Sequence, residues 1–339
     1  MSAVVVLRGD ARERGLGQAR ACPEAAPAVR DAIRSRLAAA RRDVPFLEAQ
    51  GAITARLAPE ALLEICGIAT GFGLGDDEVF DFLHIGCLND LAATPRDDDG
   101  CTAFARDGVV AKNRDFRPEH VGLQRIFLHE DPAWRGRRVL CLGSLGAPGA
   151  WSSGMNSDGL ALADTQIATA DHGPGILRYF LMNALLARCT TVAEALALIR
   201  SLPHAGGGSL VLADRSGAAA AVELRHRRVD IEQGACVAHT NHYTAAPEHL
   251  PAVAHSLGRL ETLRAALAAD PARDPRAVLA LHAPTALCRH APDPSPTLAG
   301  AVWDTGNGTA QLALGPPCST PWRRFEPAPD GWRETHALA

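Results

Sequence analysis

The amino-acid pattern of the chain changes character at Gly100. Before this glycine, apolar residues recur at helical spacing, which predicts helices over residues 24–42, 59–70 and 76–91. After it come short apolar segments bounded by Gly, Pro, Asp or Asn, which are typical of β-strands. Helices and strands therefore occur in blocks, so the alternating strand–helix units of a parallel sheet are not expected.

Several of the predicted strands are close enough in sequence to form antiparallel hairpins. The first hairpin is expected within residues 102–113, with its turn at Asp107 and Gly108. A helical stretch at 176–201 interrupts the strands, with a break near Thr190 and Thr191 where a threonine can cap a second helix. The other predicted strands are 123–129, 137–144, 149–155, 159–164, 208–214, 218–224, 228–232, 236–240 and a last pair, 298–304 and 309–315; the other predicted helices are 250–269 and 275–282. This order predicts an α+β fold of two sheets with helices outside them.

Size and composition limit the class of protein. A chain of 339 residues is expected to form one large or two modest domains. Hydrophobic residues make up 47% and charged residues 21%, which is typical of a soluble globular protein. No apolar run approaches the roughly 18 residues of a membrane span, and the run at 3–7 is too short for a signal-peptide core. We therefore expect a cytoplasmic protein without a membrane partner.

Charge and cysteine usage argue against two further classes. The net charge is −4, and no basic block with interleaved aromatic residues is present, so nucleic acid is not expected as a partner. The nine cysteines are odd in number, scattered, and never spaced as CxxC, which argues against a disulfide framework or a zinc ribbon. Most of them lie among Leu, Val, Ile and Ala and are predicted to be small buried hydrophobic residues.

A cysteine follows directly after the change of pattern. The Gly-Cys-Thr sequence at 100–102 joins an acidic loop, with aspartates at 97–99, to the first strand. A cysteine by itself is more often buried structure than a nucleophile. The Asn-Arg-Asp-Phe sequence at 113–116 ends the same hairpin, and its charged side chains are expected beside Cys101. The alternative is a solvated strand end with a surface ion pair.

Two later polar segments could also carry chemistry. The His-Thr-Asn-His sequence at 239–242 could bind a metal together with Cys236, but its spacing fits neither a zinc finger nor an HExxH site. Asn241 could instead donate to an oxyanion, or the segment could be a plain polar loop. Arg289 could hold a substrate carboxylate through two hydrogen bonds, or pair with a surface acid.

Taken in order, these motifs resemble the acyl-CoA:isopenicillin N acyltransferase family, the self-processing, cysteine-dependent branch of the N-terminal-nucleophile (Ntn) hydrolases. The resemblance covers nearly the whole chain and depends on the order of the motifs, above all Gly-Cys-Thr, Asn-x-Asp-Phe and His-Thr-Asn-His. The other matching segments are 64–69 with Gly71, 154–160, the helix at Arg178, Ser209 with Glu223, 288–289, and the final strands from Thr297 with Asp304 at their turn.

The resemblance implies a four-layer αββα sandwich and autocatalytic cleavage between Gly100 and Cys101. Cleavage would give a helical N-terminal segment, 1–100, and a catalytic portion, 101–339, which stay associated as two subunits. The implied substrate is a small-molecule amide. No metal or cofactor is implied, although acyl-CoA or another acyl donor could be a substrate.

The resemblance also implies roles for individual residues. Cys101 is the nucleophile, Asp115 holds the α-ammonium group of Cys101, and Asn241 stabilises the oxyanion. Arg114, Ser209 and Arg289 are supporting or substrate-contacting positions. All of these roles are implied by the resemblance to the family and not by the spacing of the residues.

An N-terminal cysteine suits this chemistry because it carries its own base. A free cysteine thiol has a pKa of about 8.5, whereas an α-amine has a pKa of roughly 7.7–8, close to working pH. The amine becomes available only when the bond between Gly100 and Cys101 is broken. Gly100 suits that step because a residue without Cβ tolerates a strained backbone and close packing.

The chain departs from the acyltransferase pattern at two places. Ala286 stands where the family has a serine, three residues before Arg289, and the segment 161–166 lacks the family's asparagines. Both departures argue against recognition of a penicillin-type substrate. Asp164, within the second segment, could meet a cationic amine of the substrate or be a buried structural aspartate.

Four functions stay open at this point. The leading one is hydrolysis or transfer of an acyl group at an amide of a small molecule, through a thioester on Cys101. Hydrolysis of conjugated bile acids or penicillin V is a second, although those enzymes usually begin directly at the cysteine. A non-enzymatic binding scaffold and a metal-binding protein are the others.

Overall fold

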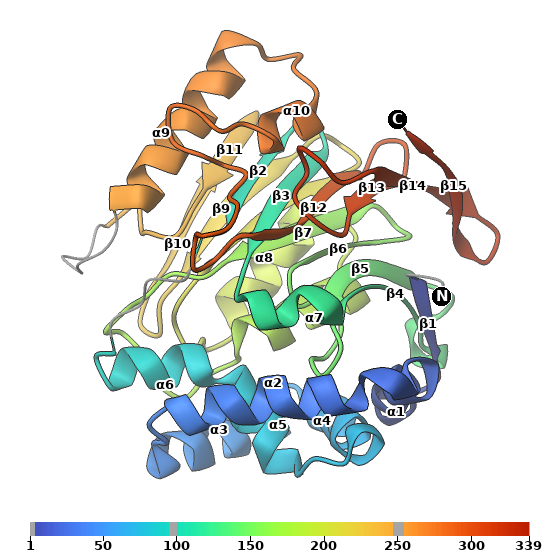
Figure 1. Cartoon of the computed structure of the whole chain (residues 1–339), viewed down its shortest axis with the longest axis vertical. Coiled ribbons are helices and arrows are strands. Elements are labelled where there is room, and N and C mark those ends of the chain that lie inside the picture. Colours follow the sequence, from blue (N-terminus) through green and yellow to red (C-terminus); the bar gives the residue numbers. More distant parts are fainter. Residues whose placement is uncertain (1–3, 95–99, 247–253, 339) are drawn as a thin grey trace.

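The computed structural model describes residues 4–94, 100–246 and 254–338. Two β-sheets lie face to face, and helices cover the outer face of each (Figure 1). This is the four-layer αββα arrangement expected from the sequence. The predicted acidic loop at 97–99 lies outside the described residues.

The first sheet has eight strands in the order β1-β4-β5-β6-β7-β8-β9-β10. Its strands are β1 (Val4–Arg8), β4 (Gln124–Glu130), β5 (Arg138–Ser144), β6 (Ser153–Asn156), β7 (Leu160–Thr165), β8 (Ser209–Asp214), β9 (Ala219–Leu224) and β10 (Val229–Gln233). Strand β1 was not predicted, and it is the one strand of this sheet that pairs in parallel, with β4. The predicted strand at 149–155 begins too early, because β6 starts only at Ser153.

The second sheet has seven antiparallel strands in the order β11-β2-β3-β12-β13-β14-β15. They are β2 (Thr102–Arg106), β3 (Val109–Asp115), β11 (Cys236–His239), β12 (Thr297–Asp304), β13 (Thr309–Ala313), β14 (Trp322–Ala328) and β15 (Gly331–Leu338). The predicted first hairpin is confirmed, and its turn places Asp107 at φ 51° and Gly108 at φ 75°, as a two-residue hairpin turn requires. Strands β14 and β15 were missed, so 298–304 and 309–315 are not the last pair.

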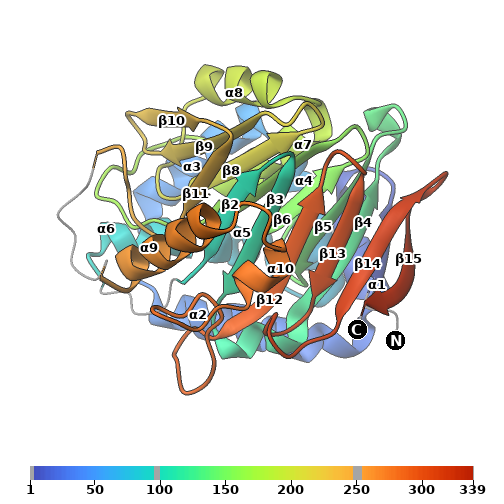
Figure 2. The same cartoon turned by 90° about the horizontal axis from the view of Figure 1, so that it is seen from above.

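Among the described residues, eight α-helices cover the first sheet and two cover the second (Figures 1 and 2). The eight are α1 (Ala11–Ala21), α2 (Ala26–Ala39), α3 (Val44–Leu57), α4 (Pro59–Phe72), α5 (Asp76–Leu83), α6 (Ile85–Leu91), α7 (Arg178–Arg188) and α8 (Val192–Ser201). The two are α9 (Ala254–Ala269) and α10 (Pro275–Leu279). The predicted helix 76–91 is divided at His84, whereas the predicted break at Thr191 is confirmed by a capping box with Glu194.

Three hydrophobic clusters mark the three boundaries between the four layers. One lies between the eight helices and the first sheet, one lies between the sheets and is rich in alanine, and one lies under α9 and α10. Strand β2 shows how one strand serves two clusters. Ala103 and Ala105 face the other sheet, while Phe104 packs toward α9 and α10.

The first 94 residues pack against the remainder of the chain. Strand β1 extends the first sheet, and Arg14 of α1 forms buried ion pairs with Glu64 and Asp131. The cluster beneath the first sheet contains Ile65 and Phe72 from this segment. Apart from β1 and a short 3-10 turn, the described secondary structure of this segment is α-helical.

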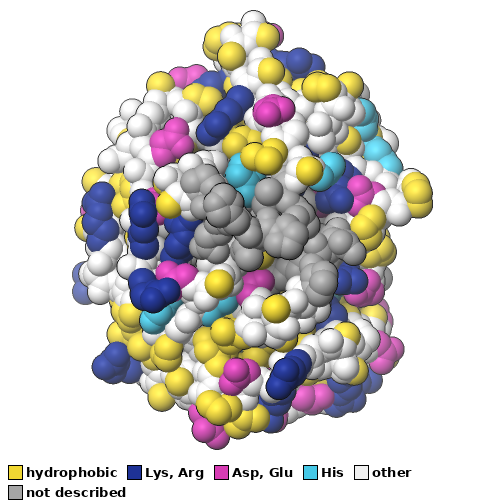
Figure 3. Space-filling model, turned by 90° about the vertical axis from the view of Figure 1, so that its left-hand side faces the viewer, with side chains coloured by type: hydrophobic (Ala, Val, Ile, Leu, Met, Phe, Trp, Pro, Cys, Tyr) yellow, Lys and Arg dark blue, Asp and Glu magenta, His cyan; other side chains and the backbone are white. Residues whose placement is uncertain are grey.

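No helix in the described ranges is long and apolar enough to cross a membrane. On the face over α9 and α6, basic and acidic side chains are interspersed (Figure 3). A cytoplasmic location stays a prediction.

Candidate active site

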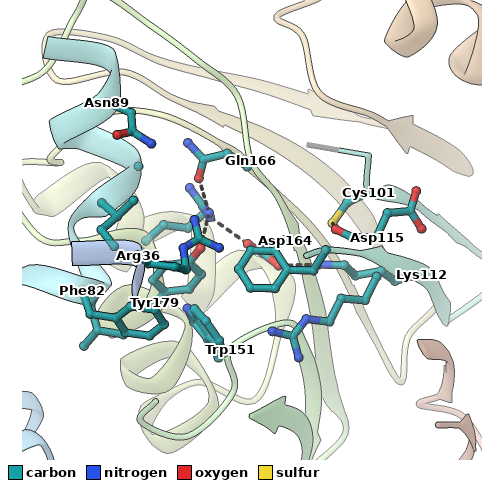
Figure 4. Close-up of a pocket in the computed structure, with 16 residues that line it drawn as sticks. Arg36, Phe82, Asn89, Cys101, Lys112, Asp115, Trp151, Asp164, Gln166 and Tyr179 are labelled. Carbon is teal, nitrogen blue, oxygen red and sulfur yellow. Dashed lines mark hydrogen bonds and ion pairs between the residues drawn. The ribbon is translucent and has the colours of Figure 1, made fainter. Parts of the chain in front are cut away.

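A small cavity, partly open to solvent, lies between the N-terminal helices and the sheets. Its walls are aromatic on the helix side, with Phe82 and Trp151, and charged on the sheet side (Figure 4). The charged wall is formed by Lys112, Arg114, Asp115 and Asp164, and Cys101 lies beside them. A pocket with aromatic walls and a few convergent polar groups is a common form of a small-molecule site.

Cys101 immediately precedes β2 and is only partly buried. Its Sγ lies 3.7 Å from the main-chain oxygen of Asp115, as the hairpin of β2 and β3 requires. Burial raises the pKa of the thiol, while the positive charge of Lys112 opposes that rise. As long as Cys101 is joined to Gly100, its nitrogen is an amide and cannot act as a base.

Asp115 ends β3 and is completely buried. Its Oδ1 accepts a hydrogen bond of 2.6 Å from the Thr297 hydroxyl, and its Oδ2 lies 3.8 Å from Nη1 of Arg289. Burial raises the pKa of this carboxyl to about 6 despite the neighbouring arginines. Oδ2 accepts no hydrogen bond within the described part of the chain, so a donor could still be accommodated there.

Gly100 lies directly against this aspartate and its arginine. A Cβ added at Gly100 would lie 1.8 Å from Nη1 of Arg289 and 2.8 Å from Oδ2 of Asp115. The arginine cannot move aside freely, because Asp293 holds its guanidinium through two hydrogen bonds. Position 100 therefore admits only glycine without displacing these groups.

Arg289 pairs with acids of the protein. Besides its two bonds to Asp293, its main-chain N–H donates to the Thr297 hydroxyl at 2.9 Å. Thr297 in turn donates to Asp115. Of the two predictions for Arg289, the geometry favours an internal pair over a substrate carboxylate contact.

Asn241 is connected to Cys101 through an arginine that the sequence analysis missed. Arg259, fully buried on α9, donates to Oδ1 of Asn241 at 2.7 Å and to the main-chain oxygen of Cys101 at 2.6 Å. The Nδ2 of Asn241 donates to the main-chain oxygen of Gln166 at 2.7 Å. An amide nitrogen carries two hydrogens, and the second one on Asn241 has no acceptor among the described residues.

Ser209 supports the segment that carries Asn241. Its hydroxyl is hydrogen-bonded to Thr165 at 2.8 Å, and Thr165 donates to the main-chain oxygen of Thr240 at 2.5 Å. His239 bonds Glu223 at 2.9 Å through one nitrogen and the Thr240 oxygen through the other. The polar segment 239–242 is thus held by hydrogen bonds inside the protein.

Asp164 is neutralised by two cations. Its Oδ1 accepts from Lys112 at 2.5 Å and its Oδ2 from Arg178 at 2.9 Å (Figure 4). These two cations hold the pKa of the carboxyl below its usual value in spite of burial. Of the two predictions for Asp164, the geometry favours the buried structural aspartate.

Lys112 was not predicted as a site residue, although one feature of the sequence distinguishes it. It is the only lysine in the chain, whose other 33 cationic residues (34 − 1) are arginines. A compact ammonium on a flexible stem differs from a guanidinium in geometry and in hydration. A lone lysine in a buried strand two residues after Val110 therefore marked a position where the chemistry of the cation matters.

Arg114 presents a buried cation to the cavity. Its Nη1 donates to Gln124 at 2.5 Å and to Ser144 at 3.1 Å, and its guanidinium lies over the ring of Trp151. No carboxylate within the described ranges reaches it at salt-bridge distance, and burial lowers its pKa to about 10. The predicted closeness of residue 114 to Cys101 is thus consistent with the shared cavity.

The structure places only some of the predicted site residues in the cavity. Four residues line the cavity, namely Cys101, Arg114, Asp115 and Asp164. The other four lie outside its described lining but are next to these residues or connected to them by contacts, namely Gly100, Ser209, Asn241 and Arg289. The residues that sequence reasoning missed are Lys112, Gln166, Arg259 and Thr297.

The sequence matches one known protein family. The family described as acyl-coenzyme A:6-aminopenicillanic acid acyl-transferase matches residues 103–318, which is 216 of 339 residues (318 − 102). The chain belongs to this family. This confirms the resemblance read from the motifs, and the description of the family is that of an acyltransferase. The matched region contains Asp115, Asn241 and Arg289 and begins two residues after Cys101.

Solved structures with a similar chain path are more distant. A mutant of conjugated bile acid hydrolase from Clostridium perfringens, altered at its cysteine, is 12% identical, with a TM-score of 0.44, covering 70% of this chain and 96% of its own. A second variant of that hydrolase, altered at an arginine, is 13% identical, with a TM-score of 0.45, covering 70% and 97%. Penicillin V acylase from Agrobacterium tumefaciens is 14% identical, with a TM-score of 0.39, covering 70% and 98%. Curated proteins give no match. The assignment of this chain to the acyltransferase family therefore depends on the sequence match to the family.

Proposed function

We propose that this protein cleaves itself between Gly100 and Cys101 and then uses Cys101 to hydrolyse or transfer an acyl group at an amide bond of a small molecule. The observation that carries the proposal is the position of Cys101. It follows a glycine that has no room for a side chain, and it lines a cavity together with Asp115 and Lys112. Family membership supports the acyl chemistry.

The self-cleavage is an acyl shift followed by hydrolysis. The Cys101 sulfur attacks the carbonyl carbon of Gly100, the C–N bond breaks, and the nitrogen of Cys101 leaves as an amine that takes up a proton. Water then hydrolyses the thioester, which returns the thiol and leaves a carboxylate on Gly100. Oδ2 of Asp115 lies beside Gly100 and accepts no hydrogen bond from the described residues, so it is placed to accept from the new α-ammonium group.

In the mature enzyme the α-amine of Cys101 takes the proton from its own thiol, and the sulfur attacks the acyl carbon of the substrate. Asn241, fixed by Arg259 and Gln166, donates its second N–H to the oxyanion. The α-ammonium group returns its proton to the nitrogen of the leaving amine as the C–N bond breaks, and water or a second amine then resolves the thioester. Which acceptor reaches the thioester decides between hydrolysis and transfer.

The cavity favours a substrate that carries an anionic or strongly polar group near an apolar one. Arg114 offers a buried cation, while Phe82 and Trp151 offer aromatic faces. Acyl-CoA or another thioester is the chemistry that could supply the acyl group. A panel of N-acyl amino acids, compared with the matching N-acyl amines, would show whether the carboxylate is needed.

The two products of cleavage are expected to stay associated. The cluster between the helices and the first sheet joins Ile65 and Phe72, before the cut, with Phe127 and Phe180, after it. Separating them would expose that core to water. Intact mass under denaturing conditions, with N-terminal sequencing, tests the proposal: it requires one fragment that begins Cys-Thr-Ala-Phe.

Replacing Gly100 by alanine is expected to slow self-cleavage at least tenfold without unfolding the protein. The added methyl group would displace Arg289 from Asp115 and shift the scissile carbonyl. The measurement is the fraction of cut chain against time on a denaturing gel, starting from freshly translated protein.

Gly51→Ala is the matched control for this change. Gly51 lies in α3, and a Cβ added there has no atom within 4 Å, so the methyl group meets open space. Its cleavage should match that of the unchanged chain. Equal cleavage of all three proteins would mean that the packing at position 100 is irrelevant to the reaction.

Replacing Lys112 by methionine is expected to raise the pKa of the Cys101 thiol. The ammonium of Lys112 lowers this pKa, and its loss also leaves Asp164 less neutralised, so both effects have the same sign. At a fixed pH below the thiol pKa the thiolate fraction therefore falls. The pH dependence of iodoacetamide alkylation, followed by peptide mass, measures it; Lys112→Arg should keep the profile nearer the original, and a downward shift in Lys112→Met would contradict this role.

A further inference from the structure

A second group of reactive side chains lies outside the active site. His282, Cys288 and His290 belong to the segment between α10 and β12, and Cys318 belongs to the segment between β13 and β14. All four possible ligand atoms lie within 4.8 Å of one another. We call these four side chains the His/Cys cluster.

The distances within the His/Cys cluster fit one tetrahedral ion. The two sulfurs are 3.6 Å apart, the two histidine Nε2 atoms are 3.1 Å apart, and Nε2 of His290 lies 3.6 Å from Cys288 and 3.3 Å from Cys318. A tetrahedral Zn²⁺ with Zn–S of about 2.3 Å and Zn–N of about 2.0–2.1 Å holds two sulfurs ~3.8 Å, sulfur and nitrogen ~3.6 Å and two nitrogens ~3.3 Å apart. Four of the six distances among the ligand atoms are therefore close to those of a tetrahedral site, and the two between His282 and the sulfurs lie within 4.8 Å.

We propose that the His/Cys cluster binds one zinc ion as a closed, structural Cys₂His₂ site. Two thiolates and two imidazoles form the donor set that Zn²⁺ takes in such sites. With four protein ligands no position is open for a substrate, which separates this site from the catalytic cavity. Binding releases the thiol protons of Cys288 and Cys318, so affinity increases with pH.

A disulfide between Cys288 and Cys318 is the competing use of the same sulfurs. Their separation of 3.6 Å is well beyond the roughly 2.05 Å of an S–S bond. A disulfide would also leave His282 and His290 without a role at this position. The approach of all four donors to a common centre favours the metal.

The ion would fasten the segment that carries part of the active site. Arg289 follows Cys288 directly and lies against Asp115, and Thr297 at the end of the same segment donates to that aspartate. Both N–H groups of Leu287 and Cys288 donate to the main-chain oxygen of Leu281, which closes the segment into a loop. Zinc would tie this loop to the connection between β13 and β14.

The test is the zinc content of the full-length protein, purified without chelators and under reducing conditions. Mass spectrometry of the metal should find about one zinc per chain, retained through dialysis against metal-free buffer. Cys318→Ser and His282→Ala should lose most of it. Both side chains are exposed, so neither change should unfold the protein.

Cys236→Ser is the matched control, because Cys236 is also exposed but lies on β11, away from the cluster. It should keep the zinc. Loss of zinc from this variant to the same extent, or no zinc in the unchanged protein after incubation with ZnCl₂ and dialysis, would overturn the proposal.

Cobalt supplies a measurement that needs no variant. The unchanged protein loaded with Co²⁺ should show thiolate-to-cobalt charge-transfer bands and the intense visible bands of tetrahedral coordination, both removed by Zn²⁺. Weak visible bands, which are typical of octahedral Co²⁺, would rule out the site. A last check is alkylation of the metal-free, denatured protein without prior reduction. If Cys288 and Cys318 stay unlabelled, they form a disulfide, and the proposal is wrong.

Discussion

Replacing Cys101 by alanine is expected to leave one uncut chain of 339 residues with no detectable acyl transfer or amide hydrolysis. The change removes the only atom that the proposed cleavage uses to attack Gly100. It also removes the nucleophile of the mature enzyme, so both reactions fail together. The unchanged protein should instead give fragments of 100 and 239 residues (339 − 100), seen by intact mass under denaturing conditions.

Two further variants make this result specific. Cys236→Ser removes an exposed thiol elsewhere and should be cut normally. Cys101→Ser keeps a weaker nucleophile at the same position and should be cut slowly if at all. Should the Cys101→Ala chain be cut at the same bond and rate, another nucleophile would be responsible and the proposed mechanism would be wrong.

The sequence predicted those parts of the site that are held together by local structure. A hairpin brings its two ends side by side, so Cys101 and Asp115 could be placed together from the turn at Asp107 and Gly108. The fold class followed in the same way, from blocks of hairpins separated by helices. Both inferences needed only contacts between residues near in sequence.

Contacts between distant segments could not be predicted in this way. Arg259 reaches Cys101 across 158 residues and also contacts Asn241, and nothing in its helical surroundings marks it as different from other arginines of the chain. The His/Cys cluster likewise joins Cys318 to Cys288 across 30 residues. The absence of CxxC spacing hid it, because its ligands come from two segments that meet only in the folded protein.

Helix α1 was not predicted from the sequence, because it contains glycines that are needed for its packing. Gly15 and Gly17 lower helix propensity and obscure the periodic pattern. In the fold, a Cβ at Gly15 would lie 2.2 Å from the main-chain oxygen of Glu64, so the glycine permits the close approach of α1 and α4. Local propensity and tertiary packing favour different residues here, and packing decides.

Replacing Asn241 by alanine is expected to lower kcat about 10²–10³-fold, as loss of one oxyanion donor typically does, with KM little changed. The donor stabilises negative charge that is present in the transition state but absent from the bound substrate. Activity can be followed as p-nitrophenolate release from p-nitrophenyl esters of short acids. Rates are expressed per free N-terminal Cys101, which corrects for any change in self-cleavage.

Asn241→Asp separates donation from positioning. Aspartate has the shape of asparagine and still accepts from Arg259, so the link between Arg259 and Cys101 is kept. It cannot donate to an oxyanion when ionised, and its charge repels one. If Asn241 acts as the donor, Asp should therefore be at least as damaging as Ala. If its role were only to hold Arg259 in place, Asp would preserve most of the activity that Ala loses, and the oxyanion assignment would have to be abandoned.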